Sequence, residues 1–318
     1  MRTLSDIGEK EAVRRFTMQL KQRGDVIAGP GDDCAIVRSP NDSVNDWLYT
    51  SDAVIEGRHF GADTAMNEVG HKALGRVLSD IAAMGGEPDW CLIDLVATGE
   101  ETVEDMDALY RAIADRADEA GLSVVGGDLA RGPCLELHVF AAGHLPQGTA
   151  IMRSGAQPGD ILYVSGTLGG SIRGKHLTFE PRLREGQWLR ERAWATAMID
   201  VTDGLYSDLC QLSEMSGVGA DIAAGAIPIS AAATEAPTTP LQAALCDGED
   251  YELLFTVPPG KQSEFETSWK STFELTATPI GKITDIGNGI CVVDQNGDSI
   301  ILDNQGYDHF AGNRNGQP

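Results

Sequence analysis

The stretch GPGDDCAIV, residues 29–37, places two adjacent carboxylates between a Gly-Pro-Gly turn and an apolar run that is typical of a strand. Asp32 and Asp33 carry like charges, and no basic residue lies within four positions of either. Two explanations are open. The pair forms a solvated turn, or a cation lies between these carboxylates and others from elsewhere in the chain.

The composition predicts a folded, acidic protein. The chain has 318 residues, of which 42% are hydrophobic, enough to build a core. It carries 24 Lys and Arg against 48 Asp and Glu, a formal net charge of −24. Such a chain lacks the basic patch that binds nucleic acid, and the same reasoning weighs against an anionic membrane surface. A polyphosphate ligand is compatible with this charge if divalent metals reverse its sign locally.

The cysteines and the N-terminus predict a cytoplasmic protein. The six cysteines include no Cys-x-x-Cys pair, which argues against a zinc site or a small disulfide framework and fits a reducing compartment. The N-terminal segment MRTLSDIGEKEAVRRF has no apolar signal core, and no apolar run is long enough to span a membrane.

Alternating strands and helices predict an α/β protein of the α+β type with two domains. In the first half, helices are expected over 4–24, 67–86 and 102–121, and strands over 47–55, 91–98, 122–132 and 134–145. We expect the strand over 122–132 to run into a Gly-rich turn. Thr102 with Asp105 has the pattern of a capping box, and Gly121 can end that helix.

A stretch rich in Gly and Pro, which begins at residue 146, marks a domain boundary and divides the chain into 1–146 and 147–318. The second unit is again α/β. Strands are expected over 160–166, 251–257, 281–286 and 290–294, and helices over 207–216 and 261–271.

The segment SGTLGGSIRGKH, residues 165–176, nearly matches a phosphate-binding P-loop. Gly169, Gly174 and Lys175 have the required spacing. A P-loop needs Ser or Thr after the lysine to hold magnesium, whereas this chain has His176. We therefore expect a flexible Gly-rich loop after a strand.

Carboxylates recur beside glycines and at the ends of apolar segments. The members of this pattern are Asp32 and Asp33, Asp52 beside Thr50 and Ser51, Asp80, Asp128, Asp200 with Asp203, and Glu249 with Asp250. A single aspartate of this kind is usually a helix cap or an Asx turn. Their recurrence favours a shared cation, because an unpaired buried charge is unfavourable. Oxygen ligands without a His or Cys cluster suit magnesium or calcium, and several magnesium ions would let an acidic site hold a polyphosphate.

The chain resembles the thiamine-monophosphate kinase family over about residues 5–310. The segments that carry the resemblance, in order, are GPGDDCAIV, TSDAVIEGRHF, HKALGRVLSDIAAMGGEP, VVGGDLARG, RSGAQPGD, IDVTDGLYSDL, GEDYELLFTVP and GYDHF. The segments LSDIAAMGG and GEDYELLFTVP are typical of this family. The GDD and GGD elements also resemble the wider superfamily of aminoimidazole ribonucleotide synthetase.

The resemblance implies an ATP-dependent enzyme that phosphorylates thiamine monophosphate to thiamine diphosphate by direct in-line transfer. It implies an N-terminal domain with a mixed sheet and helices that pairs across a homodimer, and a C-terminal α/β sandwich that completes the cleft. ATP would be held there by several magnesium ions rather than by a P-loop.

The resemblance also implies roles for individual residues. The implied catalytic residues are Asp52, Asp80 and Asp128. The implied metal ligands are Asp32, Thr50, Ser51, Asp52, Asp80, Asp128, Asp200 and Asp203. The implied nucleotide-binding residues are Tyr110, Gly127, Asp128, Arg153 and Thr202. The implied substrate-binding residues are His59, Glu249 and Phe310, which taken alone would be read as a capped histidine, a solvated glutamate and a packing phenylalanine.

Two positions depart from the family pattern. Thr202 replaces the usual Ser and keeps its hydroxyl, whereas Asp247 replaces the usual Gly, which would strain a backbone with positive φ. Two other functions stay open. One is another ATP-using enzyme of the same superfamily, and the other is a non-catalytic acidic protein that binds metal, although no EF-hand loop is present.

Overall fold

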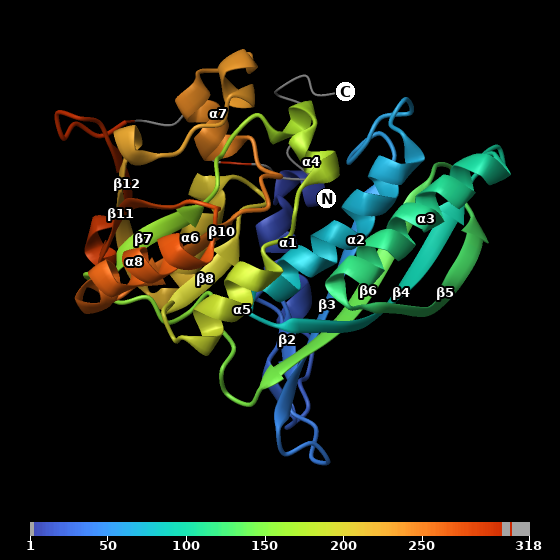
Figure 1. Ribbon diagram of the computed structural model, residues 1–318, viewed down its shortest axis with the longest axis horizontal. Coiled ribbons are helices and arrows are strands. Elements are labelled where there is room, and N and C mark those ends of the chain that lie inside the picture. The colour runs from blue at the N-terminus through green and yellow to red at the C-terminus, as the bar shows by residue number, and fades with distance from the viewer. Residues whose placement is uncertain (1–2, 301–305, 307–318) are drawn as a thin grey trace.

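Two six-stranded sheets lie side by side and are joined by one central helix (Figure 1). The computed structural model describes residues 3–300 and residue 306. Phe310, one of the expected substrate-binding residues, lies outside the described residues. Within the described part of the chain, no helix combines the length and the apolar character that crossing a membrane requires.

The first sheet has the strand order β1-β2-β3-β6-β4-β5. Its strands are β1 (Val26–Ala28), β2 (Ala35–Val37), β3 (Asn45–Ile55), β4 (Glu87–Ala97), β5 (Ser123–Arg131) and β6 (Glu136–Pro146). Only the β4–β5 pair is parallel, so the sheet is mixed as expected. Helices α2 (Met66–Ala83) and α3 (Val103–Ala120) cover one face, and their apolar side chains form a core with alternate residues of the strands.

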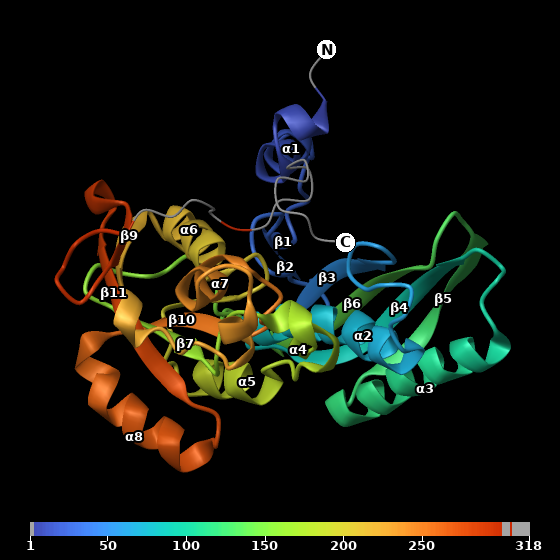
Figure 2. The ribbon, with the colours of Figure 1, turned by 90° about the horizontal axis from the view of Figure 1, so that it is seen from above.

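The second sheet has the order β12-β9-β11-β7-β10-β8 and lies between two layers of helices (Figure 2). Its strands are β7 (Ile161–Ser165), β8 (Ala197–Asp200), β9 (Val218–Ala223), β10 (Leu253–Val257), β11 (Ala277–Asp285) and β12 (Ile290–Val293). The helices are α4 (Lys175–Thr178), α5 (Leu183–Glu191), α6 (Leu205–Ser216), α7 (Pro240–Cys246) and α8 (Gln262–Thr272). Side chains alternate between two cores: Leu162 and Val164 pack with α6 and α7, whereas Tyr163 packs with α5 and α8.

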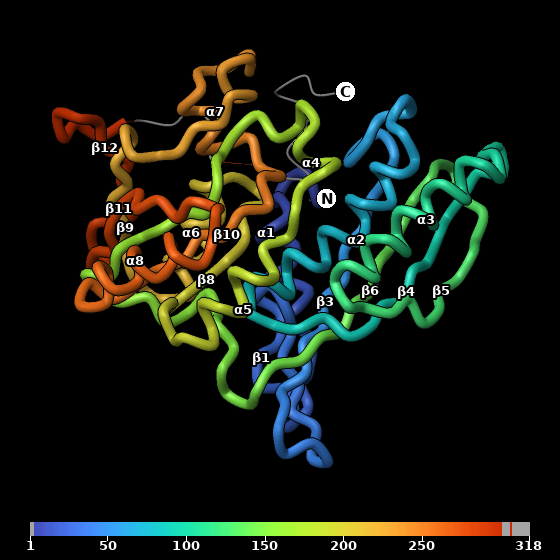
Figure 3. Tube along the Cα trace, in the orientation of Figure 1, coloured from blue at the N-terminus to red at the C-terminus, as the bar shows by residue number. Residues whose placement is uncertain are grey.

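Helix α2 connects the two halves. It contacts β3, β4, β6 and α3 in the first half, and α4, α5 and β8 in the second. The chain itself leaves β6 at Pro146 and enters β7 at Ile161 (Figure 3). Because α2 is buried along most of its length, residues on its remaining face are fixed relative to both sheets.

The expected N-terminal helix is shorter than its apolar pattern indicates. A 3-10 turn (Leu4–Asp6) comes first, Gly8 follows with φ of 74°, and α1 then spans only Glu9–Thr17. Val13 and Phe16 of α1 are more than half exposed, so little burial supports a longer helix. The expected start and end of α3 are confirmed, because Thr102 accepts the backbone N–H of Asp105 as an N-cap and Gly121 ends the helix with φ of 71°. The Asp105 carboxylate accepts from the hydroxyl of Thr102, so the pair is an N-cap rather than the predicted capping box.

The strand expected over 122–132 is confirmed as β5, which continues through Gly126 and Gly127 as far as Arg131. Gly127 has φ of 153°, and a Cβ atom there would lie 1.8 Å from the carbonyl oxygen of Ile93 on β4. The close approach of these two parallel strands therefore requires glycine at this position.

Replacing Gly127 with alanine should weaken the pairing of β5 with β4. We expect Gly127→Ala to lower the free energy of unfolding by about 2 kcal/mol or more, measured by chemical denaturation. Gly126→Ala is the matched control, since its Cβ would meet only the side chain of Leu92, at 3.3 Å. Equal stability of the two variants would contradict the packing role of Gly127.

Candidate functional site

Helix α2 presents a row of three charged side chains at the junction of the two sheets. Lys72, Arg76 and Asp80 are four residues apart, so they lie on one face of the helix over about 12 Å. The segment HKALGRVLSD therefore places two cations and one carboxylate where the two halves of the chain meet. Each member of this row contacts a different set of expected site residues.

The Asp80 end of the row is an acidic cluster, formed by Asp33, Asp80 and Asp200. One carboxylate oxygen from each residue lies within 4.8 Å of the others. The three residues come from distant segments: the turn before β2, helix α2 and the end of β8. Thr50 donates a hydrogen bond to Asp80, and Ser79 donates one to Asp200. These neutral donors compensate only part of the charge.

Burial and mutual repulsion raise the pKa values of Asp32, Asp80 and Asp200. Burial, followed by the charge of Asp33, raises the pKa of Asp200 to about 7 and that of Asp32 to about 6. Burial, followed by the charges of Asp200 and Asp52, raises the pKa of Asp80 well above its ordinary value. One buried oxygen each of Asp32 and Asp33 has no hydrogen-bond partner among the described residues. Oxygen donors with unmet charge fit a magnesium ion.

Three other expected metal ligands, Asp52, Asp203 and Ser51, are not members of this cluster. Asp52 shares the helix-covered face of β3 with Thr50, and both its oxygens accept from Arg76, at 2.7 and 2.8 Å. Asp203 lies just beyond β8, and its backbone N–H donates to Asp208 at 3.1 Å. Ser51 points to the opposite, exposed face of the sheet.

Asp128 is separated from the acidic cluster of its own chain. It pairs with Asp94 of β4, which pairs with His138 of β6, and His138 pairs with Ala53 of β3. Strand alternation then puts Asp128 on the face opposite to Thr50, and the three strand spacings alone separate β5 from β3 by about 14 Å. The structure does not bring Asp128 together with Asp80.

Of the expected nucleotide-binding residues, Arg153 lies closest to the cluster. Its guanidinium donates to Asp33 at 2.6 Å and to Gln211 at 2.8 Å, and its backbone N–H donates to Asp32 at 3.1 Å. Thr202 lies two residues after Asp200, and its backbone N–H donates to Asp208 at 2.9 Å.

The other two expected nucleotide-binding residues lie elsewhere in the first half. Tyr110 is 41% exposed on α3, and Gly127 lies within β5. Neither is joined to the acidic cluster by a hydrogen bond among the described residues.

The Lys72 end of the row joins two expected substrate-binding residues. Lys72 is fully buried and donates to the backbone carbonyl of His59 at 2.7 Å and to the carboxylate of Glu249 at 2.8 Å. Burial alone would raise the pKa of Glu249, but Lys72 and Arg76 outweigh it and lower that pKa, so the carboxylate is ionised near neutral pH. His59 accepts the N–H of Ile55 through Nδ1.

The segment around Glu249 is strained and firmly held. Glu249 and Tyr251 have φ of 53° and 51°, which is unusual for residues other than glycine. The N–H of Glu249 donates to the carbonyl of Thr202 at 2.7 Å, and Ser171 donates to the carbonyl of Glu249 at 2.6 Å. Asp247, which replaces the family's usual glycine, has a helical φ of −72° and is not strained.

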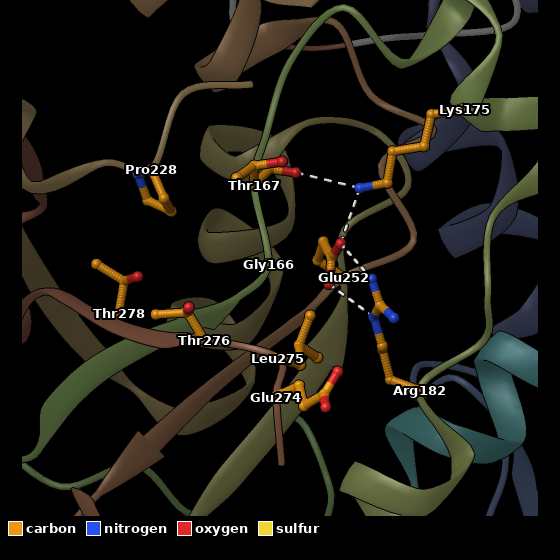
Figure 4. Close-up of a pocket in the computed structure, with 10 residues that line it drawn as sticks. All are labelled: Gly166, Thr167, Lys175, Arg182, Pro228, Glu252, Glu274, Leu275, Thr276 and Thr278. Carbon is orange, nitrogen blue, oxygen red and sulfur yellow. Dashed lines mark hydrogen bonds and ion pairs between the residues drawn. The ribbon is translucent and has the colours of Figure 1, made fainter. Parts of the chain in front are cut away.

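The Gly-rich loop, residues 165–176, lies against this segment and contains two short helical turns. Beside it is a pocket of about 440 Å³ (Figure 4). Lys175 and Arg182 point toward Glu252, which accepts from both and from Ser165 at 2.7–2.8 Å. These ion pairs neutralise the buried carboxylate and connect the loop to the residue that precedes β10. Because Lys175, Arg182 and Glu252 are already paired with one another, we assign the pocket no ligand.

Sequence reasoning missed three residues of this site. Asp33 was singled out with Asp32, but only Asp32 was expected to bind metal, whereas Asp33 belongs to the acidic cluster. Lys72 and Arg76 lie within the helix predicted over 67–86, and neither is among the expected site residues. Arg76 lies four residues and Lys72 eight residues before Asp80, and this helical spacing is the signal that could have identified them.

Comparisons with known proteins show which family this chain belongs to. Models for the N-terminal and C-terminal domains of AIR synthase related proteins match residues 31–145 and 165–294. The thiamine-monophosphate kinase of Escherichia coli strain K12 is 34% identical over 333 residues, which cover 96% of this chain and 98% of that protein.

Solved structures of similar fold include members of the same family. "AaThiL complexed with AMPPCP and TMP" has a TM-score of 0.83 at 28% identity and covers 97% of this chain and 99% of that one. The thiamine-monophosphate kinase of Stenotrophomonas maltophilia K279a has a TM-score of 0.74 at 33% identity and covers 91% of this chain and 96% of that one. With two domain models, a curated relative and these structures all in agreement, the chain belongs to the thiamine-monophosphate kinase family.

Proposed function

We propose that this chain transfers the γ-phosphoryl group of ATP to thiamine monophosphate and forms thiamine diphosphate and ADP. Family membership and the relative that was solved with AMPPCP and TMP support this function. The observation that carries it is the row on α2. Asp80 of the acidic cluster and Lys72, which holds His59 and Glu249, lie on one helix face about 12 Å apart. A metal-bound donor and an acceptor can therefore meet along this face.

The proposed transfer is direct. An anionic oxygen of the acceptor phosphate forms a bond to the γ-phosphorus. The bond from that phosphorus to the oxygen bridging the β- and γ-phosphates breaks, and ADP leaves with the electron pair. Because the acceptor oxygen is already ionised near neutral pH, the reaction needs neither a strong general base nor a phosphoenzyme.

Different residues of the chain would bind the phosphoryl donor and the acceptor. Magnesium held by the acidic cluster, with the expected ligands Asp32, Asp52 and Asp203, would neutralise phosphate charge and orient the reacting groups. Arg153 and Thr202 would contact the nucleotide. His59 and Glu249 would hold the thiamine part of the acceptor, with the expected contribution of Phe310 lying outside the described residues.

We also propose a homodimer that pairs through residues 1–146. The face of the first sheet that the helices leave open carries Tyr49, Leu92 and Phe140, with Phe140 38% exposed, and the edge strand β5 is exposed along its whole length. Exposed apolar sheet faces and edges are typical of interfaces. Because Asp128 lies on the same face, it would serve the acidic cluster of the second copy, while residues 147–318 complete each cleft.

The function predicts a specific reaction in a purified assay. With ATP and magnesium, the protein should convert thiamine monophosphate to thiamine diphosphate, should leave free thiamine unchanged, and should stop when a chelator is added. Product separation by chromatography checks all three. A protein that hydrolyses ATP but forms no thiamine diphosphate would contradict the proposed substrate and favour another activity of the superfamily.

Replacing Asp80 with asparagine should separate metal binding from folding. In metal-free buffer we expect Asp80→Asn to melt at or above the wild-type temperature, because one of three mutually repelling charges is removed. Magnesium should raise the melting temperature of the wild type but not of the variant. Turnover should fall at least about 100-fold.

The exposed Asp118 on α3 provides the matched control for this experiment. Asp118→Asn should keep both the wild-type turnover and the wild-type response to magnesium. Stabilisation of Asp80→Asn by magnesium to the wild-type extent would show that the acidic cluster is not the metal site.

The proposed dimer can be tested on the open face of the first sheet. We expect Phe140→Arg to give a folded monomer by sedimentation and to reduce turnover, since a charge would replace an apolar contact at the interface. Val103→Arg on α3, at a residue that is 72% exposed, is the control and should not change the mass. A wild-type protein that sediments as a monomer at assay concentration would refute the dimer.

A further inference from the structure

We propose that Arg76 binds the phosphate of the acceptor and thereby gives the enzyme its preference for phosphorylated over unphosphorylated thiamine. This inference rests on the proposed function and assigns a role to a residue that the expected site does not include. Three observations support it: the position of Arg76, the donors that it has available and the balance of charge around it.

Arg76 occupies the middle of the row on α2, between the metal end and the substrate end. Its Nε and Nη2 atoms donate to Asp52, an expected metal ligand. Its Nη1 atom points toward Glu249 and Tyr251, at 3.4 and 3.3 Å. An acceptor whose thiamine part is held by Glu249, and whose phosphate faces a metal-bound donor, must place that phosphate near this guanidinium.

Arg76 also has donors available for a ligand. The two contacts of Nη1 are longer than the 2.7–3.2 Å of ordinary N–H···O hydrogen bonds, so they are weak. The neighbouring Lys72, by contrast, is fully buried and has three short contacts, to the His59 carbonyl and to both oxygens of Glu249. A side chain of Arg76 that is 14% exposed can reach a ligand, whereas the ammonium of Lys72 cannot.

The charges around Arg76 balance only while Asp52 and Glu249 are both paired with Lys72 and Arg76. Lys72 and Arg76 supply two positive charges, and Asp52 and Glu249 supply two negative charges. If Asp52 directs its charge to a metal ion, the guanidinium keeps a positive charge that a phosphate can satisfy. The planar fork of arginine matches two phosphate oxygens at once, which a lysine cannot do.

A purely structural role is the competing explanation, because Arg76 links α2 to β3 and to the Glu249 segment. A structural link would affect the binding of both forms of thiamine alike. A phosphate contact would affect only the phosphorylated form. The ratio of the two affinities therefore separates the two roles.

The test measures binding rather than turnover. Dissociation constants for thiamine monophosphate and for thiamine are determined by calorimetry, with magnesium and a non-hydrolysable ATP analogue present. We expect Arg76→Gln to weaken binding of thiamine monophosphate about 10- to 100-fold and to change binding of thiamine less than about threefold. Arg76→Lys should give an intermediate loss.

The matched control is Arg190→Gln. Arg190 is also a buried arginine that joins the two halves, through Glu87 at 3.2 Å, but it lies outside the site. This variant should keep both affinities.

An unchanged ratio of the two affinities in Arg76→Gln would overturn the inference. If that variant does not fold, as judged by circular dichroism, the ratio in Arg76→Lys decides in the same way. A wild-type protein that binds neither compound would contradict the proposed function itself.

Discussion

Three carboxylates confined within 4.8 Å of one another are the constraint on which the rest of this site depends. Asp33, Asp80 and Asp200 come from segments far apart in the chain, so only the complete fold brings them together. Such a cluster is unfavourable for an isolated protein, because burial and like charges both oppose ionisation. Hydrogen bonds from Thr50, Ser79 and Arg153 compensate part of that energy. Binding of the proposed cation would offset the remainder and would link metal binding to the stability of the junction between the two halves.

Helix α2 connects the acidic cluster to the other charged residues of the site. It is packed against both sheets, and its one charged face runs from Lys72 through Arg76 to Asp80. Donor and acceptor ends of the proposed reaction are therefore set on a single rigid element, which fixes their separation. The strained backbone at Glu249 belongs to the same arrangement, since it is pinned to Thr202 on one side and to Ser171 on the other.

Local signals predicted most of the secondary structure but not the relations between distant segments. The cap of α3 and the carboxylates at strand ends are encoded within a few residues, and both were identified. Which face of a sheet a residue occupies depends on pairing with other strands, and this separated Asp128 and Ser51 from Asp80. Helix α1 is shorter than predicted because its large apolar side chains remain exposed, and the sequence of this segment alone does not show which side chains will be buried. Lys72 and Arg76 became interpretable only when their partners, Glu249 and Asp52, were in place.

The most direct test of this account is the position of metal in a crystal grown with manganese and a non-hydrolysable ATP analogue, located by anomalous scattering. The account predicts a peak bonded to oxygens of Asp33, Asp80 and Asp200, because one carboxylate oxygen of each lies within 4.8 Å of the others. Peaks confined to exposed carboxylates, with none at this cluster, would contradict the claim that a cation unites the domain junction and the site.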